Sequence, residues 1–200
     1  MIEQLANTIS GLFLSKNIIK ENDLSIYTYG MEILISEFIS TIIAYCIGIV
    51  THKLFQTMLY LFVFSFIRVY TGGYHASTHR NCIILFNFLL VITILLIECF
   101  SNKVIHPLLV SNTIASAGII FTIAPVADTH KPFNSFEKNI YKRKARTRTV
   151  LLSFTLILIY TFSSKFQTLA AYGMAAICEI AFFLTVGLIK NKWIDCNWRW

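Results

Sequence analysis

The sequence predicts an all-α protein, a polytopic membrane helix bundle in a single domain over residues 1–200. Three observations carry this prediction. Only 14% of the 200 residues are charged, whereas an average soluble domain has about 25%. Hydrophobic residues make up 56% of the chain and fall in long runs, and the mean hydropathy is +0.66. Soluble, disordered and nucleic-acid-binding classes are therefore excluded.

Residues 1–22 are expected to form an amphipathic helix at the membrane interface. Ile2, Leu5, Ile9 and Leu12 recur at steps of three and four residues, with polar residues between them. This spacing places one apolar stripe along a helix. Such a stripe lies on the inner leaflet or packs against the bundle, and the sequence leaves both alternatives open.

Six apolar runs follow, and we expect each to cross the membrane. A span needs about 20 predominantly apolar residues. Three of the runs are shorter and cross only if their polar flanks reach the headgroups. Four spans with two re-entrant or interfacial segments are the alternative. The runs cover residues 33–50 (extending back to residue 24), 54–67, 82–97, 104–126, 150–163 and 168–189.

The distribution of positive charge predicts the orientation in the membrane. With six spans and the N-terminus inside, 14 of the 17 Lys and Arg residues lie on inner segments. Only Lys53, Lys103 and Lys165 lie on outer ones. Because cytoplasmic segments are enriched in Lys and Arg, both termini, the segment 68–82 and a basic loop over residues 127–149 are expected in the cytoplasm.

The segment 68–82 carries the candidate chemistry, since it contains His75, His79 and Cys82 after two adjacent glycines. An imidazole can take the proton of a thiol, and the thiolate then attacks a carbonyl. On a continuous helix His79 reaches Cys82, whereas His75 lies about 10 Å away along the axis. For His75 to reach Cys82, the chain must bend between them, or Cys82 must lie at the start of the third span. At that position a helix N-terminus stabilises a thiolate. A loop without chemistry is the alternative.

A metal site is the rival interpretation of the same residues. His75, His79 and Cys82 follow an H-x3-H-x2-C spacing, which places three zinc ligands on one helical face. A zinc hydrolase of the H-E-x-x-H type needs a glutamate beside the first histidine, and Ala76 stands there. Metal catalysis is therefore disfavoured, and neither a metal nor a cofactor is expected at the site.

The order and spacing of Arg68, Gly72, Gly73, His75 and Cys82 closely resemble the AgrB family of Gram-positive quorum-sensing peptidases. The later Ala124-Pro125-Val126 and Lys131-Pro132 are similar to the family's segment before its basic loop. The resemblance covers essentially the whole chain. The individual motifs are short, and their order and spacing give the match its specificity.

The resemblance implies a cysteine endopeptidase in the cell membrane of a Gram-positive bacterium, acting on a precursor peptide of the AgrD type. It implies that Cys82 is the nucleophile, that His75 is its base, and that Arg68, Gly72 and Gly73 shape the site. Cys82 would release the C-terminal tail of the precursor. A cysteine or serine inside the peptide would then attack the thioester and close a thiolactone or lactone ring.

The basic residues are expected to have two uses. They hold their segment in the cytoplasm, and they could also attract an acidic tail of the precursor. The residues named for this second use are Lys131, Lys142, Arg143 and Lys144.

A small transporter or the transmembrane domain of a sensor is the second functional class. Glu37, Glu98 and Glu179 fall in or beside spans, where ionisable residues are costly and often functional. Transporters commonly contain internal repeats, and the two halves of this chain show no convincing repeat. The expected partners are the precursor peptide and the lipid bilayer, and a homodimer is left open.

Overall fold

The computed structural model describes residues 2–74, 76, 78–99, 105–126 and 135–197. It divides into two compact units. The first unit holds Met1–Ile47 and Ala76–Val91, and the second unit holds Gly48–His75 and Ile92–Trp200. The division falls within two of the long helices, so each of these helices contributes to both units.

Helices dominate the described residues, which contain no named β-strand. Five of the helices are long and apolar enough to cross a membrane, namely α2, α3, α4, α6 and α7, and α5 is a shorter apolar helix. The predicted all-α membrane bundle is confirmed. The elements are α1 Ile2–Ser15, η1 Glu21–Asp23, α2 Leu24–Val50, α3 Leu54–Thr71, α4 His79–Cys99, α5 Ile105–Ile123, α6 Ser135–Phe162, η2 Ser164–Phe166 and α7 Gln167–Asn197.

The prediction of a basic loop over residues 127–149 is wrong for most of that range. Helix α6 begins at Ser135 and runs without a break to Phe162. Lys and Arg are good helix formers, and their charge does not prevent a helix from extending beyond the apolar run. Residues 127–134 lie outside the described part of the chain.

In the first unit, α2 and α4 run in the same direction. His79 Nε2 lies 3.1 Å from Glu32 Oε2, and Asn87 Nδ2 donates to Ser40 Oγ at 3.0 Å. Both partners advance by eight residues between these two pairs, which only parallel helices allow. Consecutive spans cross a membrane in opposite directions. The first and third spans, here α2 and α4, must therefore be parallel to each other.

Helix α1 leaves half of its apolar stripe exposed within the first unit. Ala6 and Ser10 are buried, whereas Leu5 and Leu12 are 46% and 53% exposed. A helix that packed its apolar stripe onto the bundle would bury these leucines. The exposure favours the expected position at the membrane interface.

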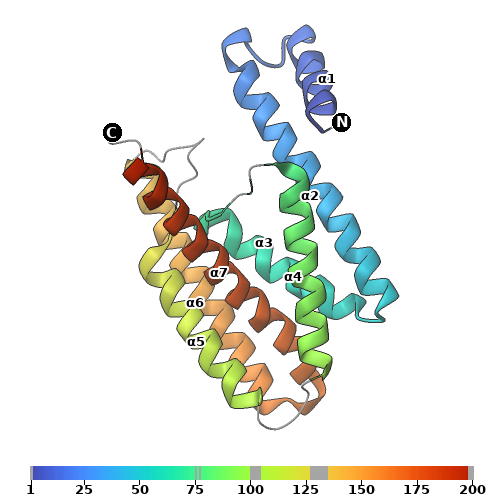
Figure 1. The fold of residues 1–200 in the computed structure, drawn as a ribbon, viewed down its shortest axis with the longest axis vertical. Helices are drawn as coiled ribbons and strands as arrows, with labels where there is room; N and C mark the ends of the chain where they lie inside the picture. Colours follow the sequence, from blue (N-terminus) through green and yellow to red (C-terminus); the bar gives the residue numbers. More distant parts are fainter. Residues whose placement is uncertain (1, 75, 77, 100–104, 127–134, 198–200) are drawn as a thin grey trace. The chain divides into compact units, whose positions relative to one another are not determined.

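In the second unit, α7 packs against α3, α5 and α6 (Figure 1). Tyr60 and Phe64 of α3 contact Glu179 and Phe183 of α7, an advance of four residues on each helix that makes these two helices parallel. Gly173 allows close packing, because a Cβ there would lie 2.9 Å from the methyl groups of Leu156 in α6.

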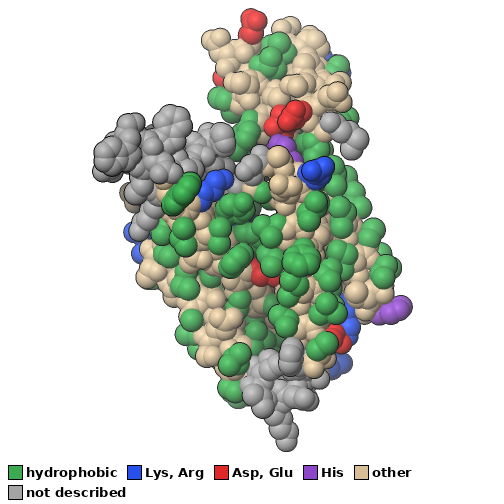
Figure 2. All heavy atoms as spheres, in the orientation of Figure 1, with side chains coloured by type: hydrophobic (Ala, Val, Ile, Leu, Met, Phe, Trp, Pro, Cys, Tyr) green, Lys and Arg blue, Asp and Glu red, His purple; other side chains and the backbone are tan. Residues whose placement is uncertain are grey.

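Large apolar side chains also cover much of the outer surface of the helices, and Figure 2 shows them spread over the visible faces. Phe38 and Phe88 of the first unit are 68% and 60% exposed, and Phe154 of the second unit is 62% exposed. An exposed apolar surface of this extent indicates contact with a partner or a membrane. For helices of this length and composition, a lipid bilayer shields the surface from water.

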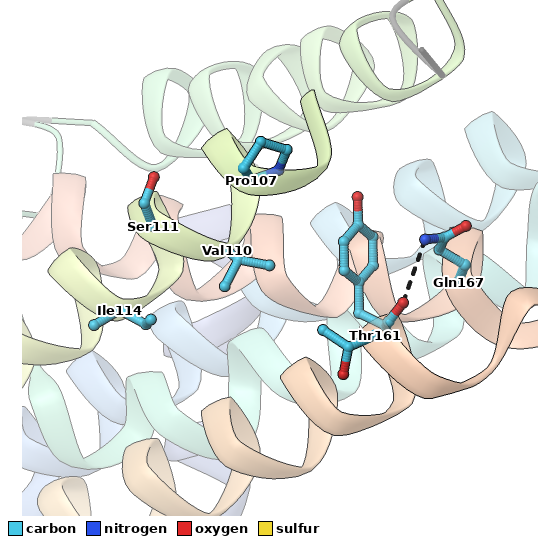
Figure 3. A pocket seen from close by; sticks show the side chains of 7 residues that line it. Pro107, Val110, Ser111, Ile114, Thr161 and Gln167 are labelled. Carbon is cyan, nitrogen blue, oxygen red and sulfur yellow. Dashed lines mark hydrogen bonds between the residues drawn. The ribbon is translucent and has the colours of Figure 1, made fainter. Parts of the chain in front are cut away.

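A cavity of about 470 Å³ lies between α5, the end of α6 and the start of α7 in the second unit (Figure 3). Gln167 Nε2 donates to the carbonyl oxygen of Tyr160 beside it. The cavity is formed by the beginning of α5, whereas the end of α5 leads into the segment that contacts Gly72. Within the second unit, the cavity and the glycine turn therefore lie at opposite ends of α5.

Candidate active site

Helix α3 ends at a pair of glycines that turns the chain sharply. The backbone N–H of Gly72 donates to the carbonyl oxygen of Arg68 at 3.2 Å. Gly72 and Gly73 then adopt φ angles of 64° and 115°, a region that residues with a Cβ rarely occupy. Two non-glycine residues would strain this turn, and the chain would enter the candidate site in another direction.

The residues that follow α5 hold the same turn in the second unit. The Val126 N–H donates to the carbonyl oxygen of Thr71 at 2.9 Å, and the Gly73 N–H donates to that of Val126 at 3.3 Å. A Cβ on Gly72 would collide with the Val126 carbonyl oxygen. The Ala124-Pro125-Val126 segment, noted from the sequence, is thus a support for the glycine turn.

Helix α7 supplies a second support, which the sequence analysis missed. The Tyr74 N–H donates to the carbonyl oxygen of Phe183 at 2.8 Å. A Cβ on Gly187 would lie 2.5 Å from the Tyr74 nitrogen, so glycine at this position lets α7 approach the turn. Lys190 Nζ lies 5.1 Å from the centre of the Tyr74 ring, within the range of a cation–π contact.

Arg68 ties α3 to both the turn and α7. Its Nη2 donates to the carbonyl oxygen of Tyr74 at 2.6 Å, and its Cζ lies 5.1 Å from the centre of the Phe183 ring. A Cβ on Gly73 would lie 2.6 Å from Arg68 Nη1. Arg68, Gly72 and Gly73 are therefore brought together, and they fix the backbone of the residue before His75. His75 itself lies outside the described residues.

Cys82 lies in the first turn of α4, in the first unit. The Asn81 N–H donates to Thr78 Oγ1 at 3.3 Å, so Thr78 caps the helix, and the Cys82 N–H donates to the Thr78 carbonyl oxygen at 3.1 Å. The thiol is partly exposed and forms no disulfide. Cys82 thus lies at the start of the third span, where the positive end of the helix dipole favours a thiolate. The part of this expectation that concerns His75 lies outside the described residues.

His79 is the first residue of α4 and contacts Glu32 of α2 at 3.1 Å. Glu32 was not among the residues that the sequence analysis singled out. A signal for it exists, because Glu32, Ser36 and Ser40 recur at steps of four residues within an apolar stretch. The structure brings His79 and Glu32 together on neighbouring helices of the first unit, and His79 stands three residues before Cys82 on α4.

The metal interpretation needs His75 as its first ligand, and His75 lies outside the described residues. Among the residues that are described, no three His, Cys, Asp or Glu side chains come close enough together to hold a metal ion.

Several basic residues of α6 contact aromatic rings of α3 in the second unit. Arg148 donates to the carbonyl oxygen of Phe66 at 2.9 Å, and its Cζ lies 4.2 Å from the centre of the Tyr70 ring. Lys144 Nζ lies 5.1 Å from the same ring. Of the other residues expected to attract the precursor tail, Lys142 is partly exposed and Arg143 exposed, and Lys131 lies outside the described part.

Comparison with known proteins tests the family resemblance that the segment from Arg68 to Cys82 suggests. The family model for Accessory gene regulator B matches residues 2–188, which include the whole segment from Arg68 to Cys82. This chain belongs to the AgrB family. The resemblance predicted from the motif is confirmed.

Two relatives from Clostridium perfringens carry AgrB-like names. "Putative AgrB-like protein" of strain SM101 is 26% identical over 179 residues, which cover 87% of this chain and 80% of that protein. "Putative AgrB-like protein 2" of strain 13 is 26% identical over 209 residues, covering 98% and 97%. No solved structure matches the chain significantly. In this AgrB-family protein, the glycine turn and the start of α4 flank the segment that holds His75.

Proposed function

We propose that this protein is a membrane-embedded cysteine endopeptidase that processes the precursor of a quorum-sensing peptide. Its substrate is a short peptide of the AgrD type with an amphipathic leader, an internal cysteine or serine, and an acidic tail. The protein releases the tail and retains the rest of the peptide as a thioester, from which the ring closes.

The observation that carries this proposal is the position of Cys82 in the first turn of α4, within a chain that the AgrB family model matches over residues 2–188. The capped helix N-terminus favours the thiolate form of the cysteine, which is the nucleophilic form. Of the cysteines in the chain, Cys46, Cys99 and Cys178 lie well inside or at the far end of apolar helices.

In the proposed reaction His75 accepts the proton of the Cys82 thiol. The sulfur attacks the carbonyl carbon at the end of the future ring, the peptide C–N bond breaks, and the tail leaves as an amine that takes the proton from His75. Arg68, Gly72 and Gly73 act as positioning residues, because they fix the backbone through which the chain reaches His75.

Ring closure must compete with hydrolysis of the thioester. Ring closure is faster than hydrolysis when water is excluded from the thioester while the internal nucleophile of the peptide is held close to the carbonyl carbon. A site at the edge of an apolar bundle excludes water, and an inner-leaflet surface holds the amphipathic leader near Cys82. The exposed Arg143 and its basic neighbours Lys142 and Lys144 attract the acidic tail, together with Lys131 from the segment before α6.

The proposed location is the cell membrane of a Gram-positive bacterium, with six spans and with both termini and the active site on the cytoplasmic side. The charge distribution supports this orientation, since 14 of the 17 Lys and Arg residues fall on the inner segments. The parallel course of α2 and α4 in the first unit, and of α3 and α7 in the second, supports alternate crossings.

The test is cleavage of a synthetic precursor by the purified protein in liposomes without an ion gradient. We expect Cys82→Ser and His75→Ala to abolish release of the tail, whereas Cys46→Ser and Cys178→Ser cleave at the wild-type rate. Tail release that persists in Cys82→Ser would refute the proposal. Wild-type protein that cleaves nothing but moves the peptide across a membrane under a gradient would favour a transporter.

A further inference from the structure

The His79–Glu32 pair has no assigned part in tail release, yet it lies beside the nucleophile. His79 stands three residues before Cys82 on α4, and its Nε2 lies 3.1 Å from Glu32 Oε2. Both side chains are partly buried, with 29% and 19% exposed. An ionisable pair at the junction of two apolar helices is costly to desolvate.

Glu32 determines which ring nitrogen of His79 can accept a proton. A carboxylate can only accept hydrogen bonds, so His79 Nε2 carries the hydrogen in this contact. The neutral imidazole then has its lone pair on Nδ1. A carboxylate that holds an imidazole in one tautomer and one orientation is the usual companion of a histidine base.

His79 and Cys82 are neighbours on α4, three residues apart. Residues three apart on a helix are neighbours, with about 5–6 Å between their Cβ atoms. Side chains on a helix lean toward its N-terminus, so the Cys82 side chain leans toward the turn that holds His79. An acyl group on Cys82 would therefore present its thioester to the same turn.

The proposed function does not assign the base of ring closure. Ring closure needs the internal thiol or hydroxyl of the peptide to lose a proton while it attacks the thioester. His75 is neutral again once its proton has left with the tail, so His75 and His79 are the two candidate bases. Of these two, His79 is the one whose carboxylate partner lies within the described residues.

We propose that His79, oriented by Glu32, is the general base of ring closure. This inference rests on the proposed function and adds a catalytic residue for its second step. In this step Nδ1 of His79 accepts the proton of the internal thiol, and the thiolate attacks the thioester carbon. The bond from that carbon to Cys82 Sγ breaks, and the released Cys82 thiolate takes the proton from His79. One bond to sulfur forms and one breaks, the proton passes from the peptide to Cys82, and no other reactant is needed.

The two steps can be measured separately in a single turnover with a synthetic precursor that has an amphipathic leader, an internal cysteine and an acidic tail. We expect His79→Ala to release the tail within about threefold of the wild-type rate. Its cyclic product should form at least about 100-fold more slowly, in the usual range for loss of a general base, and the acyl-enzyme on Cys82 should accumulate. Glu32→Gln should show the same pattern with a smaller loss.

Two matched controls separate this role from a structural one. Ser40→Ala removes a second polar contact between α2 and α4, which Ser40 makes with Asn87, and Arg80→Ala changes an exposed neighbour of His79. Both should cyclise normally. Equal losses of tail release and ring closure in His79→Ala, or wild-type ring closure, would overturn the inference. Tail release that does not depend on Cys82 would instead overturn the proposed function.

Discussion

The backbone N–H of Tyr74 donates a 2.8 Å hydrogen bond to the carbonyl oxygen of Phe183. Helix α7 thus holds the residue that precedes His75, although the two lie far apart in the sequence. The close approach depends on Gly187, one turn further along α7, whose missing side chain leaves room for the Tyr74 backbone.

Gly187→Val should reduce tail release by at least about tenfold, because a Cβ at this position would lie 2.5 Å from the Tyr74 nitrogen and displaces the backbone next to His75. A misplaced catalytic group commonly costs about 10²-fold in rate. The measurement is the single-turnover rate of tail release, read by mass spectrometry.

Gly118→Ala is the matched control, since a Cβ on that helical glycine meets nothing within 4 Å. It should cleave at the wild-type rate. Equal activity of Gly187→Val and Gly118→Ala would show that the contact between α7 and Tyr74 does not position the site.

Arg68→Lys should also be impaired, although it preserves the charge. Arg68 combines a 2.6 Å hydrogen bond to the Tyr74 carbonyl oxygen with a position 5.1 Å from the Phe183 ring centre. The planar guanidinium makes both contacts at once, and an ammonium does not. Because a misplaced catalytic group can cost about 10²-fold in rate, kcat should fall about tenfold or more. Arg143→Lys, at an exposed position, is the control. A wild-type kcat in Arg68→Lys contradicts the positioning role.

The fold was largely predictable from the sequence because apolar runs are a direct signal in membrane proteins. Helix α2 extends back to Leu24 as expected, and α4 begins three residues before the apolar run. The long basic start of α6 was not predictable in this way, because hydropathy locates the span and not the helix that continues beyond it.

The candidate site was only partly predictable. Arg68, Gly72 and Gly73 are close in sequence to His75 and share a recognisable spacing, so local inspection finds them. Gly187 and Glu32 come from distant segments, and their roles depend on how helices pack. Nothing in a single sequence pairs Gly187 with Tyr74, or Glu32 with His79.

The membrane topology predicts opposite labelling at two exposed positions of the second unit. Lys165 lies in η2, between α6 and α7, and Arg143 lies near the beginning of α6. In a cysteine-free background, an impermeant thiol reagent should label Lys165→Cys on intact cells. It should label Arg143→Cys only after permeabilisation. Lys165→Cys that resists the reagent on intact cells would contradict six spans and favour four.

A polar cluster within the second unit predicts a measurable contribution to stability. Thr93 Oγ1 donates to Glu179 Oε1 at 2.6 Å, and the Tyr60 hydroxyl donates to the other carboxylate oxygen. Hydrogen bonds between membrane helices contribute about 0.6 kcal/mol on average and up to about 1.7. Thr93→Val should therefore lower the midpoint of thermal unfolding in detergent by about 2–4 °C.

Thr155→Val is the control for this measurement, because Thr155 is exposed and bonds only within its own helix, to the Leu151 carbonyl oxygen at 2.9 Å. Its unfolding midpoint should stay at the wild-type value. Equal midpoints for Thr93→Val and Thr155→Val would mean that the Glu179 cluster does not stabilise the packing of α4 and α7.

The most direct test of the account is to trap the covalent intermediate. A precursor whose internal nucleophile is replaced by alanine can still be attacked by Cys82, but it cannot cyclise. Because the apolar surroundings exclude water, we expect the truncated precursor to accumulate on Cys82 through a bond that hydroxylamine cleaves, and Cys82→Ala to lack the adduct in mass spectrometry. Linear peptide released at the normal rate, with no adduct after rapid quenching, would contradict the account and identify water as the acceptor.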